Sequence, residues 1–420
     1  MCNCFNLFQN SIKKKEILNI IEKINTPFWL YDIKMIYKKI KLLNNFDIIR
    51  FAQKACSNIN ILKLMKKKGV KIDAVSLGEI ERAIQSGFSI KENDIVFTAD
   101  IFDQETVDKI TKFNIPVNIG SIDMLHQLGK ISPNHDIWIR INPGFGHGHN
   151  KKTNTGGNNS KHGILYPKKI LKIIKEYGFN VIGLHMHIGS GVNYEHLQKV
   201  CNSMLHQAYS LNIDISSISA GGGISVPYKD NENHVDINHY FSLWNKTRKK
   251  IENYFGHHVN LEIEPGRFLV AESGILICKI YTIKKTDKYT FILVDAGFND
   301  LMRPILYGSY HKITILPQKN RNIDYSETKK VVIGGPLCEA GDIFTQNKNG
   351  NLEERDLPLV EIGDYLIFHN TGAYGASMSS IYNSRPLIPE ILYENNSFKI
   401  IRKKQTIHDL LKLENSIIKI

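Results

Sequence analysis

The chain has 420 residues, of which 42% are hydrophobic and 23% are charged. This composition is typical of a globular protein and excludes a fibrous or disordered chain, and the length suffices for one large domain and a second one. The formal net charge is +13. The lysines are scattered among Ile and Asn, as in Ser11–Glu16 and Lys63–Lys71. Because no basic stripe interleaved with aromatic residues is present, we attribute the charge to composition and expect no nucleic-acid partner.

The cysteines show neither a disulfide framework nor a CxxC pair, which favours a reducing compartment. They are Cys2, Cys4, Cys56, Cys201, Cys278 and Cys338. No apolar run reaches the roughly 18 residues of a membrane-spanning helix. The N-terminus has no basic region followed by an apolar core, so no signal peptide is predicted. We therefore expect a cytoplasmic protein without a membrane contact.

Residues 1–23 are predicted to form a tail and a helix, and the helix is Ser11–Lys23. An aromatic strand, Pro27–Asp32, and a helix, Ile33–Asn44, follow. Short apolar runs then alternate with amphipathic patterns of helical period. The expected strands are Ile48–Lys54, Val70–Ser76, Asp94–Asp100, Pro116–Ser121, Asp136–Pro143, Asn180–Gly189, Ile215–Gly223 and Asn260–Arg267. The expected helices include Ile59–Lys68, Gly78–Ser86, Gln104–Phe113, Met124–Lys130, Pro167–Tyr177 and Tyr194–Leu211.

Eight strand–helix units predict an α/β fold with a closed (β/α)8 barrel over residues 33–268, although a doubly wound open sheet is the structural competitor. After Arg267 the helical pattern stops, and the strands expected are Leu276–Lys284, Tyr289–Asp295, Lys312–Leu316, Lys330–Gly334, Tyr365–Asn370 and Phe398–Arg402. These predict a mostly β C-terminal domain made of residues 24–32 and 269–420, which takes the strand Pro27–Asp32. The Gly/Asn-rich loop Gly144–Gly163 is either a disordered insertion or a mobile active-site lid.

Polar residues recur where the expected barrel strands end, which is where barrel enzymes place their chemistry. Such residues are Lys54, Asp73 with Glu79 beyond it, Arg140, His185 and His187, the run Gly221–Gly223, and Glu262 and Glu264 with Arg267 beyond them. Each alone has a structural explanation: a strand-end lysine reaches solvent, a barrel histidine is hydrogen-bonded, and glycines form turns. Together they favour one connected site, because isolated buried charges are costly. The pattern shows no metal signature.

The chemistry of these groups suits pyridoxal 5'-phosphate. A lysine amine bonds covalently to an aldehyde, and backbone N–H groups of a glycine run cradle a phosphate with help from an arginine. A carboxylate keeps a ring nitrogen protonated, and a neutral imidazole lies against the ring face.

The expected β domain holds a second set of polar, glycine-rich loops. They are Asp295–Pro304, Tyr307–Tyr310, Gly335–Asp342 and His369–Ser380. Cys338 lies beside Glu339 between turn glycines. This is an unusual place for a packing cysteine, so we interpret Cys338 as a functional residue.

Six motifs carry a family resemblance: FAQKACSN, HMHIGSG, SAGGG, EIEPGR, GPLCEAGD and TGAYGASMSS. Together they resemble the fold-type III pyridoxal-phosphate decarboxylases, over a span from about Pro27 to Leu411. The segments RINPGFGHGHNKKTNTGGNNSKHG and DAGFNDLMRPILYGSYH are closer to members that act on meso-diaminopimelate than to ornithine or arginine decarboxylases.

The resemblance implies a two-fold homodimer with shared active sites and a set of residue roles. Lys54, His187 and Cys338 would be catalytic: the covalent anchor, the ring-stacking group and the proton donor. The implied cofactor-binding residues are Lys54, Asp73, Arg140, His187, Ser190, Gly223, Glu264, Pro265, Gly266, Arg267 and Tyr374. The implied substrate-binding residues are Arg267, Arg303, Tyr307, Glu339 and Tyr374. Cys338 and Glu339 would act in the partner subunit's site.

The implied reaction removes one carboxylate of meso-2,6-diaminopimelate and releases L-lysine and carbon dioxide, the last step of lysine biosynthesis. The alternative is decarboxylation of another basic amino acid or polyamine precursor, namely ornithine, arginine or carboxynorspermidine. Arg303 favours a substrate with a second carboxylate, because a plain diamine would leave a bidentate arginine unpaired. A catalytically silent homologue is disfavoured because Lys54 and Cys338 are both present.

Overall fold

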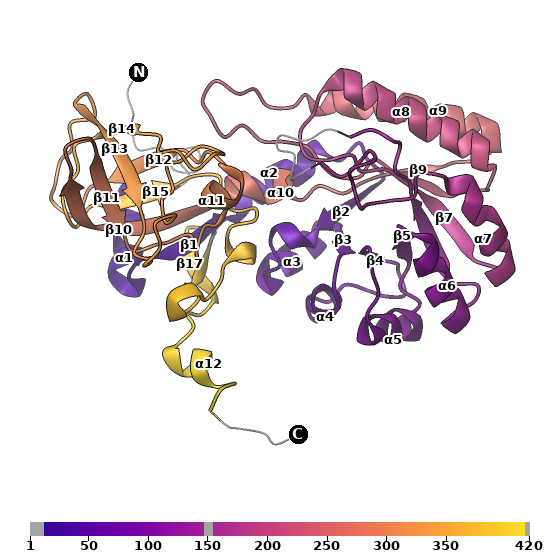
Figure 1. Cartoon of the computed structure of the whole chain (residues 1–420), viewed down its shortest axis with the longest axis horizontal. Helices are drawn as coiled ribbons and strands as arrows, with labels where there is room; N and C mark the ends of the chain where they lie inside the picture. Colours follow the sequence, from indigo (N-terminus) through magenta and orange to yellow (C-terminus); the bar gives the residue numbers. More distant parts are fainter. Residues whose placement is uncertain (1–11, 147–153, 416–420) are drawn as a thin grey trace. The chain divides into compact units, whose positions relative to one another are not determined.

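The computed structural model describes residues 12–146 and 154–415 (Figure 1). Contacts within the chain divide it into two units, which are described separately below. The barrel unit consists of Tyr37–Val226 and Asn233–Leu269. The β unit consists of the described residues up to Ile36, the segment Pro227–Glu232, and the described residues from Val270 onward. Pro227–Glu232 therefore groups with the β unit, although it lies inside the span expected for the barrel.

The barrel unit contains a closed parallel barrel, which confirms the predicted fold and rules out the open doubly wound sheet. Its strands are neighbours in chain order, and β2 pairs with β9 to close the ring. They are β2 (Ile48–Ala52), β3 (Lys71–Ala74), β4 (Ile95–Thr98), β5 (Val117–Ile119), β6 (Asp136–Arg140), β7 (Asn180–His185), β8 (Ser217–Ser219) and β9 (Asn260–Ile263).

Helices precede and follow the barrel strands along the chain. They are α2 (Ile33–Leu42), in which the boundary between the units falls, α3 (Ile59–Lys66), α4 (Leu77–Gln85), α5 (Gln104–Phe113), α6 (Ile122–Ile131), α7 (Leu171–Tyr177), α8 (Tyr194–Leu211), α9 (Ile237–Phe255) and the short α10 (Arg267–Val270). Several begin at a side chain that caps the helix, as Ser76 does for α4 and Asp103 for α5. Such caps satisfy the first backbone N–H groups.

The barrel strands end earlier than the sequence predicts. β2 ends at Ala52, and Lys54 lies in the 3-10 turn Gln53–Ala55 with an exposed side chain. The prediction of a strand extending to Lys54 was therefore wrong, as was the assumption that this lysine is buried. Of the polar residues expected at strand ends, Lys54, His187, the glycine run and Glu264 lie in the turns that follow the strands. Asp73, Arg140, His185 and Glu262 are still strand residues.

The β unit contains nine strands among its described residues. They are β1 (Phe28–Asp32), β10 (Gly274–Lys285), β11 (Thr290–Val294), β12 (Ile313–Leu316), β13 (Thr328–Gly334), β14 (Arg355–Pro358), β15 (Tyr365–Phe368), β16 (Glu390–Glu394) and β17 (Ser397–Arg402). β1 pairs antiparallel with β10 and parallel with β16, which confirms that the N-terminal strand joins this unit. β14 and β16, and the short helices α11 (Arg303–Tyr307) and α12 (Ile407–Leu411), are additions to the predicted elements.

Helix α1 (Lys14–Ile24) supplies part of the core of the β unit. Its buried side chains Ile17, Ile20 and Ile21 lie on one face, at helical spacing. They belong to the same cluster as Phe28 of β1 and other buried residues of the sheet, which are Ile277, Leu316, Ile367 and Ile391. The helix therefore covers one side of the sheet through an amphipathic face.

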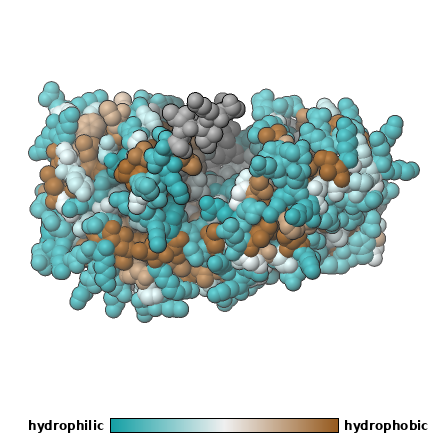
Figure 2. All heavy atoms as spheres, turned by 90° about the horizontal axis from the view of Figure 1, so that it is seen from below, coloured by the Kyte–Doolittle hydropathy of each residue, from teal (hydrophilic) through white to brown (hydrophobic). Residues whose placement is uncertain are grey.

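The surface is mainly hydrophilic, and hydrophobic side chains gather in several patches on the face that Figure 2 shows. Exposed large apolar side chains include Ile101, Ile362 and Ile407. None of the helices in the part of the chain that the structure describes is long and apolar enough to cross a membrane.

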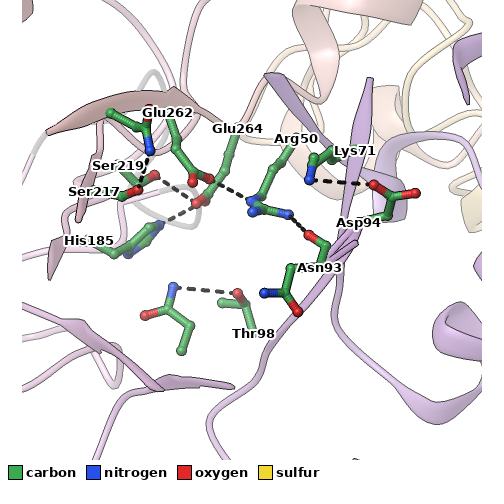
Figure 3. Close-up of polar contacts among 12 residues, drawn as sticks. Arg50, Lys71, Asn93, Asp94, Thr98, His185, Ser217, Ser219, Glu262 and Glu264 are labelled. Carbon is green, nitrogen blue, oxygen red and sulfur yellow. Dashed lines mark hydrogen bonds and ion pairs between the residues drawn. The ribbon is translucent and has the colours of Figure 1, made fainter. Parts of the chain in front are cut away.

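Arg50 and Glu262 form a buried ion pair inside the barrel unit (Figure 3). The Nε atom of Arg50 lies 2.5 Å from a carboxylate oxygen of Glu262, and the two side chains are 5% and 3% exposed. Arg50 also donates to the carbonyl of Asn93 at 3.0 Å. The sequence placed Glu262 beside Glu264 among the polar strand-end residues, whereas the structure pairs it with a residue of β2.

We predict that Glu262→Ala lowers the free energy of unfolding by about 3–5 kcal/mol, because it leaves the Arg50 guanidinium buried without its partner. Urea unfolding followed by circular dichroism measures the change. Glu81→Ala is the control, because Glu81 and Lys109 form a more exposed pair in the same unit, for which the expected loss is about 1 kcal/mol or less. Equal losses in the two variants would contradict the prediction.

Candidate active site

Lys54 lies close to the two acidic residues of the next strand–helix unit. Burial raises the pKa of Asp73 on β3 to about 6 and that of Glu79 on α4 to about 7, and the positive charge of Lys54 acts on both in the opposite direction. Glu79 accepts a hydrogen bond from the backbone N–H of Val75 at 2.9 Å. The Oδ1 atom of Asp73 is buried and has no hydrogen-bond partner among the described residues. The charge of Lys54 therefore acts on a buried carboxylate that holds an unsatisfied acceptor.

Glu264 follows β9, and its carboxylate is held on both oxygens (Figure 3). One oxygen lies 2.8 Å from Nε2 of His185, at the end of β7. The other accepts a hydrogen bond from the Ser219 hydroxyl, at the end of β8, at 2.7 Å. Burial alone would raise the pKa of Glu264, but the interactions with His185 and Ser219 lower it to about 2. Glu264 is therefore an anion at neutral pH.

His187 lies two residues beyond β7 and is neutral. Burial, followed by repulsion from Arg140 and Lys54, holds its pKa well below the ordinary value. Its Nδ1 atom is buried without a hydrogen-bond partner among the described residues. Arg140, at the end of β6, is itself buried, and burial lowers its pKa while attraction to Asp100 and Glu264 acts in the opposite direction. The imidazole is thus an uncharged ring next to two cations.

The glycine run after β8 lies tightly against the neighbouring strand ends. Gly221 and Gly223 have positive φ angles of 62° and 101°. A Cβ atom on Gly222 would lie 2.5 Å from the carbonyl oxygen of Glu264, and one on Gly223 would lie 2.3 Å from that of Gly189. Only glycine avoids such contacts, so the run brings backbone close to a pocket that Gly189, Gly191, Gly222, Gly223, His196 and Trp244 help to line.

The remaining expected cofactor residues of the barrel unit lie next to these groups along the chain. Ser190 lies between Gly189 and Gly191, both of which have positive φ angles. Pro265 accepts a hydrogen bond from the N–H of Ala52 at 3.3 Å, which ties the segment after β9 to the end of β2. Gly266 precedes α10, which begins at Arg267. The barrel therefore brings Lys54, Asp73, Arg140, His187 and Glu264 into mutual electrostatic range.

The residues present fit pyridoxal phosphate. Lys54 offers an amine, Glu264 an anion and His187 a neutral ring, and the glycine run offers backbone at close approach. Asp73 Oδ1 and His187 Nδ1 are buried without a hydrogen-bond partner among the described residues, and buried polar atoms ordinarily find partners. His185 and Ser219 were not assigned roles in the sequence analysis. The alternation of Ser217 and Ser219 along a buried strand, SIS, is the pattern that could have indicated an inward hydroxyl.

Cys338 and Glu339 lie on a loop of the β unit that neighbouring side chains hold in place. The Cys338 side chain is exposed, and its backbone N–H donates to the Oδ1 of Asn383 at 2.9 Å. The Tyr382 hydroxyl donates to the Glu339 carboxylate at 3.2 Å. Asp342 accepts from two backbone N–H groups, which are those of Phe298 and Leu337, both at 2.8 Å. The loop is therefore fixed at both ends while its thiol remains accessible.

The other expected β-unit residues occupy two separate segments. Arg303 and Tyr307 are the first and last residues of α11, and Arg303 is 5% exposed. Tyr374 adopts a left-handed backbone conformation, with φ 57°, in the loop after β15. A positive φ is uncommon for a residue other than glycine and often marks a functional loop.

The barrel and its cluster define a pyridoxal-phosphate-dependent enzyme. Comparison with known families narrows the class: residues 33–271 match the family described as "Pyridoxal-dependent decarboxylase, pyridoxal binding domain". The chain belongs to the pyridoxal-dependent decarboxylases, as the motifs of the sequence predict.

Several relatives that match nearly the whole chain are named diaminopimelate decarboxylases. The diaminopimelate decarboxylase of Buchnera aphidicola subsp. Acyrthosiphon pisum is 60% identical over 97% of this chain and 98% of its own length. A crystal structure of diaminopimelate decarboxylase has a TM-score of 0.95 at 53% identity and covers 97% of this chain and 99% of its own. The Helicobacter pylori diaminopimelate decarboxylase in complex with L-lysine has a TM-score of 0.80 at 31% identity, over 94% of this chain and 98% of its own. The predicted resemblance is confirmed.

We predict that Gly222→Ala weakens binding of pyridoxal phosphate and lowers the free energy of unfolding by about 1–3 kcal/mol, because the new methyl group forces the Glu264 backbone to shift. Absorbance titration of the apoprotein with pyridoxal phosphate measures the binding. Gly78→Ala in α4 is the matched control, since a Cβ there meets only the Ser76 hydroxyl at 3.9 Å. Unchanged cofactor affinity in Gly222→Ala would contradict the prediction.

Proposed function

We propose that this protein decarboxylates meso-2,6-diaminopimelate to L-lysine and carbon dioxide, the last step of lysine biosynthesis. The observation that carries the proposal is the Glu264 anion, held by His185 and Ser219 beside neutral His187 and close to Lys54. The high identity to diaminopimelate decarboxylases supports the choice of substrate.

Each barrel residue has a role in holding the cofactor. Lys54 would hold it covalently through its amine, and Glu264 would keep the ring nitrogen protonated. His187 would lie against the ring face, where a neutral imidazole adds no competing charge. Asp73 and Arg140 complete the wall of the site. Bound pyridoxal phosphate supplies the electron sink that accepts the pair left when carbon dioxide departs.

The phosphate is assigned to the backbone N–H groups of the glycine run and to side chains near it. Gly223 and Ser190 lie on two segments that are hydrogen-bonded through the N–H of Gly191 and the carbonyl of Gly223 at 2.9 Å. Pro265 and Gly266 place the chain, and Arg267 supplies the positive charge. Tyr374 contributes a hydroxyl to the phosphate or to the substrate.

Substrate recognition and proton return are assigned to the β unit. Arg303 and Tyr307 bind the distal carboxylate of the substrate, and Glu339 binds the distal amine, with Arg267 also available to a carboxylate. When the carbon–carbon bond to the leaving carboxylate breaks, the Cys338 thiol donates its proton to the carbon atom that has lost carbon dioxide. Decarboxylation of ornithine, arginine or carboxynorspermidine is the second candidate. Arg303 disfavours it for substrates without a second carboxylate.

The proposal includes a two-fold homodimer in the cytoplasm, in which Cys338 and Glu339 of each copy serve the barrel of the other. The exposed thiol on a fixed loop supports a role toward a partner surface. Hydrophobic patches on the surface are typical of interfaces (Figure 2). Size measurement in solution tests the dimer. Mixing inactive Lys54→Ala with inactive Cys338→Ala then tests the shared sites, because exchange of subunits restores one complete site per dimer.

We predict that the purified protein releases lysine and carbon dioxide from meso-diaminopimelate far faster than it releases carbon dioxide from ornithine or arginine. It should also carry an absorbance band from the covalently held cofactor that disappears in Lys54→Ala. Amino-acid analysis and absorption spectroscopy measure the two results. A protein without cofactor, in which Lys54→Ala is as active as the parent, would refute the proposed function.

We predict that Cys338→Ala retains the cofactor band but loses turnover by about 100-fold or more, the contribution expected from a positioned proton donor. Cys338→Ser is the control variant, because a hydroxyl keeps the size and a weak donor. Steady-state rates with meso-diaminopimelate provide the measurement. Turnover equal to that of the parent would remove Cys338 from the mechanism.

A further inference from the structure

Arg303 is buried in the β unit and contacts a histidine. Its Nη1 lies 2.8 Å from Nε2 of His311, and the two residues are 5% and 4% exposed. A guanidinium is always charged and only donates hydrogen bonds. Nε2 of His311 must therefore be the acceptor and carry no proton. The contact by itself fixes the ring as neutral and selects one of its two tautomers.

The contact of the other ring nitrogen, Nδ1, is consistent with this tautomer of His311. Nδ1 of His311 lies 2.8 Å from the carbonyl oxygen of His369, which only accepts, so Nδ1 carries the proton. His369 is fixed in turn, because its N–H donates to the carbonyl of Lys312 at 2.9 Å and its Nε2 lies 2.8 Å from the Thr314 hydroxyl. Both nitrogens of the His311 ring are therefore used, and the ring cannot rotate without breaking two hydrogen bonds.

A tyrosine from a different part of the chain also contacts Arg303. The guanidinium carbon lies 4.8 Å from the centre of the Tyr228 ring, and this ring also meets His311 edge-on at 5.4 Å. The segment Pro227–Glu232 is fastened to the β unit near this point. Asp230 pairs with Lys312 at 2.8 Å, and Asn370 donates to the carbonyl of Pro227 at 2.9 Å. An imidazole and an aromatic face therefore hold the plane of the guanidinium.

The chemistry of these contacts matters for the charge of Arg303. A carboxylate at position 311 would hold the guanidinium as firmly but would neutralise it. An imidazole acceptor and a ring face fix its position and bring no negative charge of their own. Lys312 and Asp230, which lie on these segments, pair with each other at 2.8 Å.

We infer that His311 is a positioning residue that sets specificity for a substrate with a distal carboxylate, by orienting Arg303 without neutralising it. This inference rests on the proposed function, in which Arg303 binds that carboxylate. Tyr228 assists from the other side of the guanidinium. Because His311 acts through Arg303, its loss affects affinity for the carboxylate more than the bond-breaking step.

The test compares His311→Gln with His311→Glu in the purified holoenzyme. The two replacements have the same size, and both can accept a hydrogen bond from Arg303, but only glutamate brings a negative charge. We expect His311→Gln to keep the KM for meso-diaminopimelate within about threefold of the parent and His311→Glu to raise it by about tenfold or more, the effect of about 1.4 kcal/mol in binding. We expect kcat to change by less than about threefold in both variants, because loss of His311 affects affinity more than the bond-breaking step.

Competitive inhibition by L-lysine gives a second readout, which measures binding without the decarboxylation step. L-lysine keeps the distal carboxylate of the substrate, so its inhibition constant should follow the same order as the KM values. Tyr228→Leu leaves the His311 hydrogen bond in place and should raise KM and the inhibition constant together. This variant provides the test if a His311 variant fails to fold.

Two outcomes would contradict the inference and can be told apart. If the parent enzyme does not form lysine from meso-diaminopimelate, the proposed function fails and the inference fails with it. If the parent is active but His311→Gln and His311→Glu show equal KM values, or if kcat falls as much as KM rises, His311 has only a structural role. Thermal unfolding of each variant confirms that folded protein is compared.

Discussion

The buried carboxylate of Glu264 is the constraint on which the rest of the barrel site depends. A carboxylate taken out of water must be paired or hydrogen-bonded, or it takes up a proton. Here His185 and Ser219 each hold one oxygen, and the pKa falls to about 2. Burial raises the pKa of Asp73, and the negative charge of Glu264 adds to this effect. The same charge, together with that of Asp100, favours the charged form of the buried Arg140. The electrostatics of the site therefore follow from the way one anion is satisfied.

Closure of the barrel brings His185, Ser219 and Glu264 together. Adjacent parallel strands align His185 of β7 with Ser219 of β8, and Ser219 with Glu262 of β9. Glu264 lies two residues beyond Glu262, on the same side of the chain, so its carboxylate reaches both neighbours. A shift of one residue in either register would turn one of these side chains toward the helices. The geometry of the anion is thus a consequence of strand register, to which every strand of the closed ring contributes.

The sequence predicted the barrel, its eight strands and the candidate residues at their ends, because alternation of apolar strands with amphipathic helices is a strong pattern. It could not predict where each strand stops. Lys54 was taken as a buried strand residue, yet it lies exposed in a 3-10 turn. Ser219 received no role, because a serine becomes informative only when the register shows which side chain it meets. Strand β14, RDLP, is short and partly charged, so periodicity gives little indication there. Strand β16, EILYE, is a buried and mostly apolar run that the sequence analysis did not assign.

The same limitation explains why sequence alone could not separate Glu262 from Glu264 in the motif EIEPGR. Glu262 meets the Arg50 guanidinium, so two opposite formal charges cancel and both serve the fold. Glu264 is held by a hydroxyl and an imidazole, and Arg303 of the β unit by an imidazole and an aromatic face. Fixing a buried charge through hydroxyl, imidazole or ring contacts leaves its field directed at a ligand. The choice of partner therefore distinguishes a structural charge from one that is available for binding.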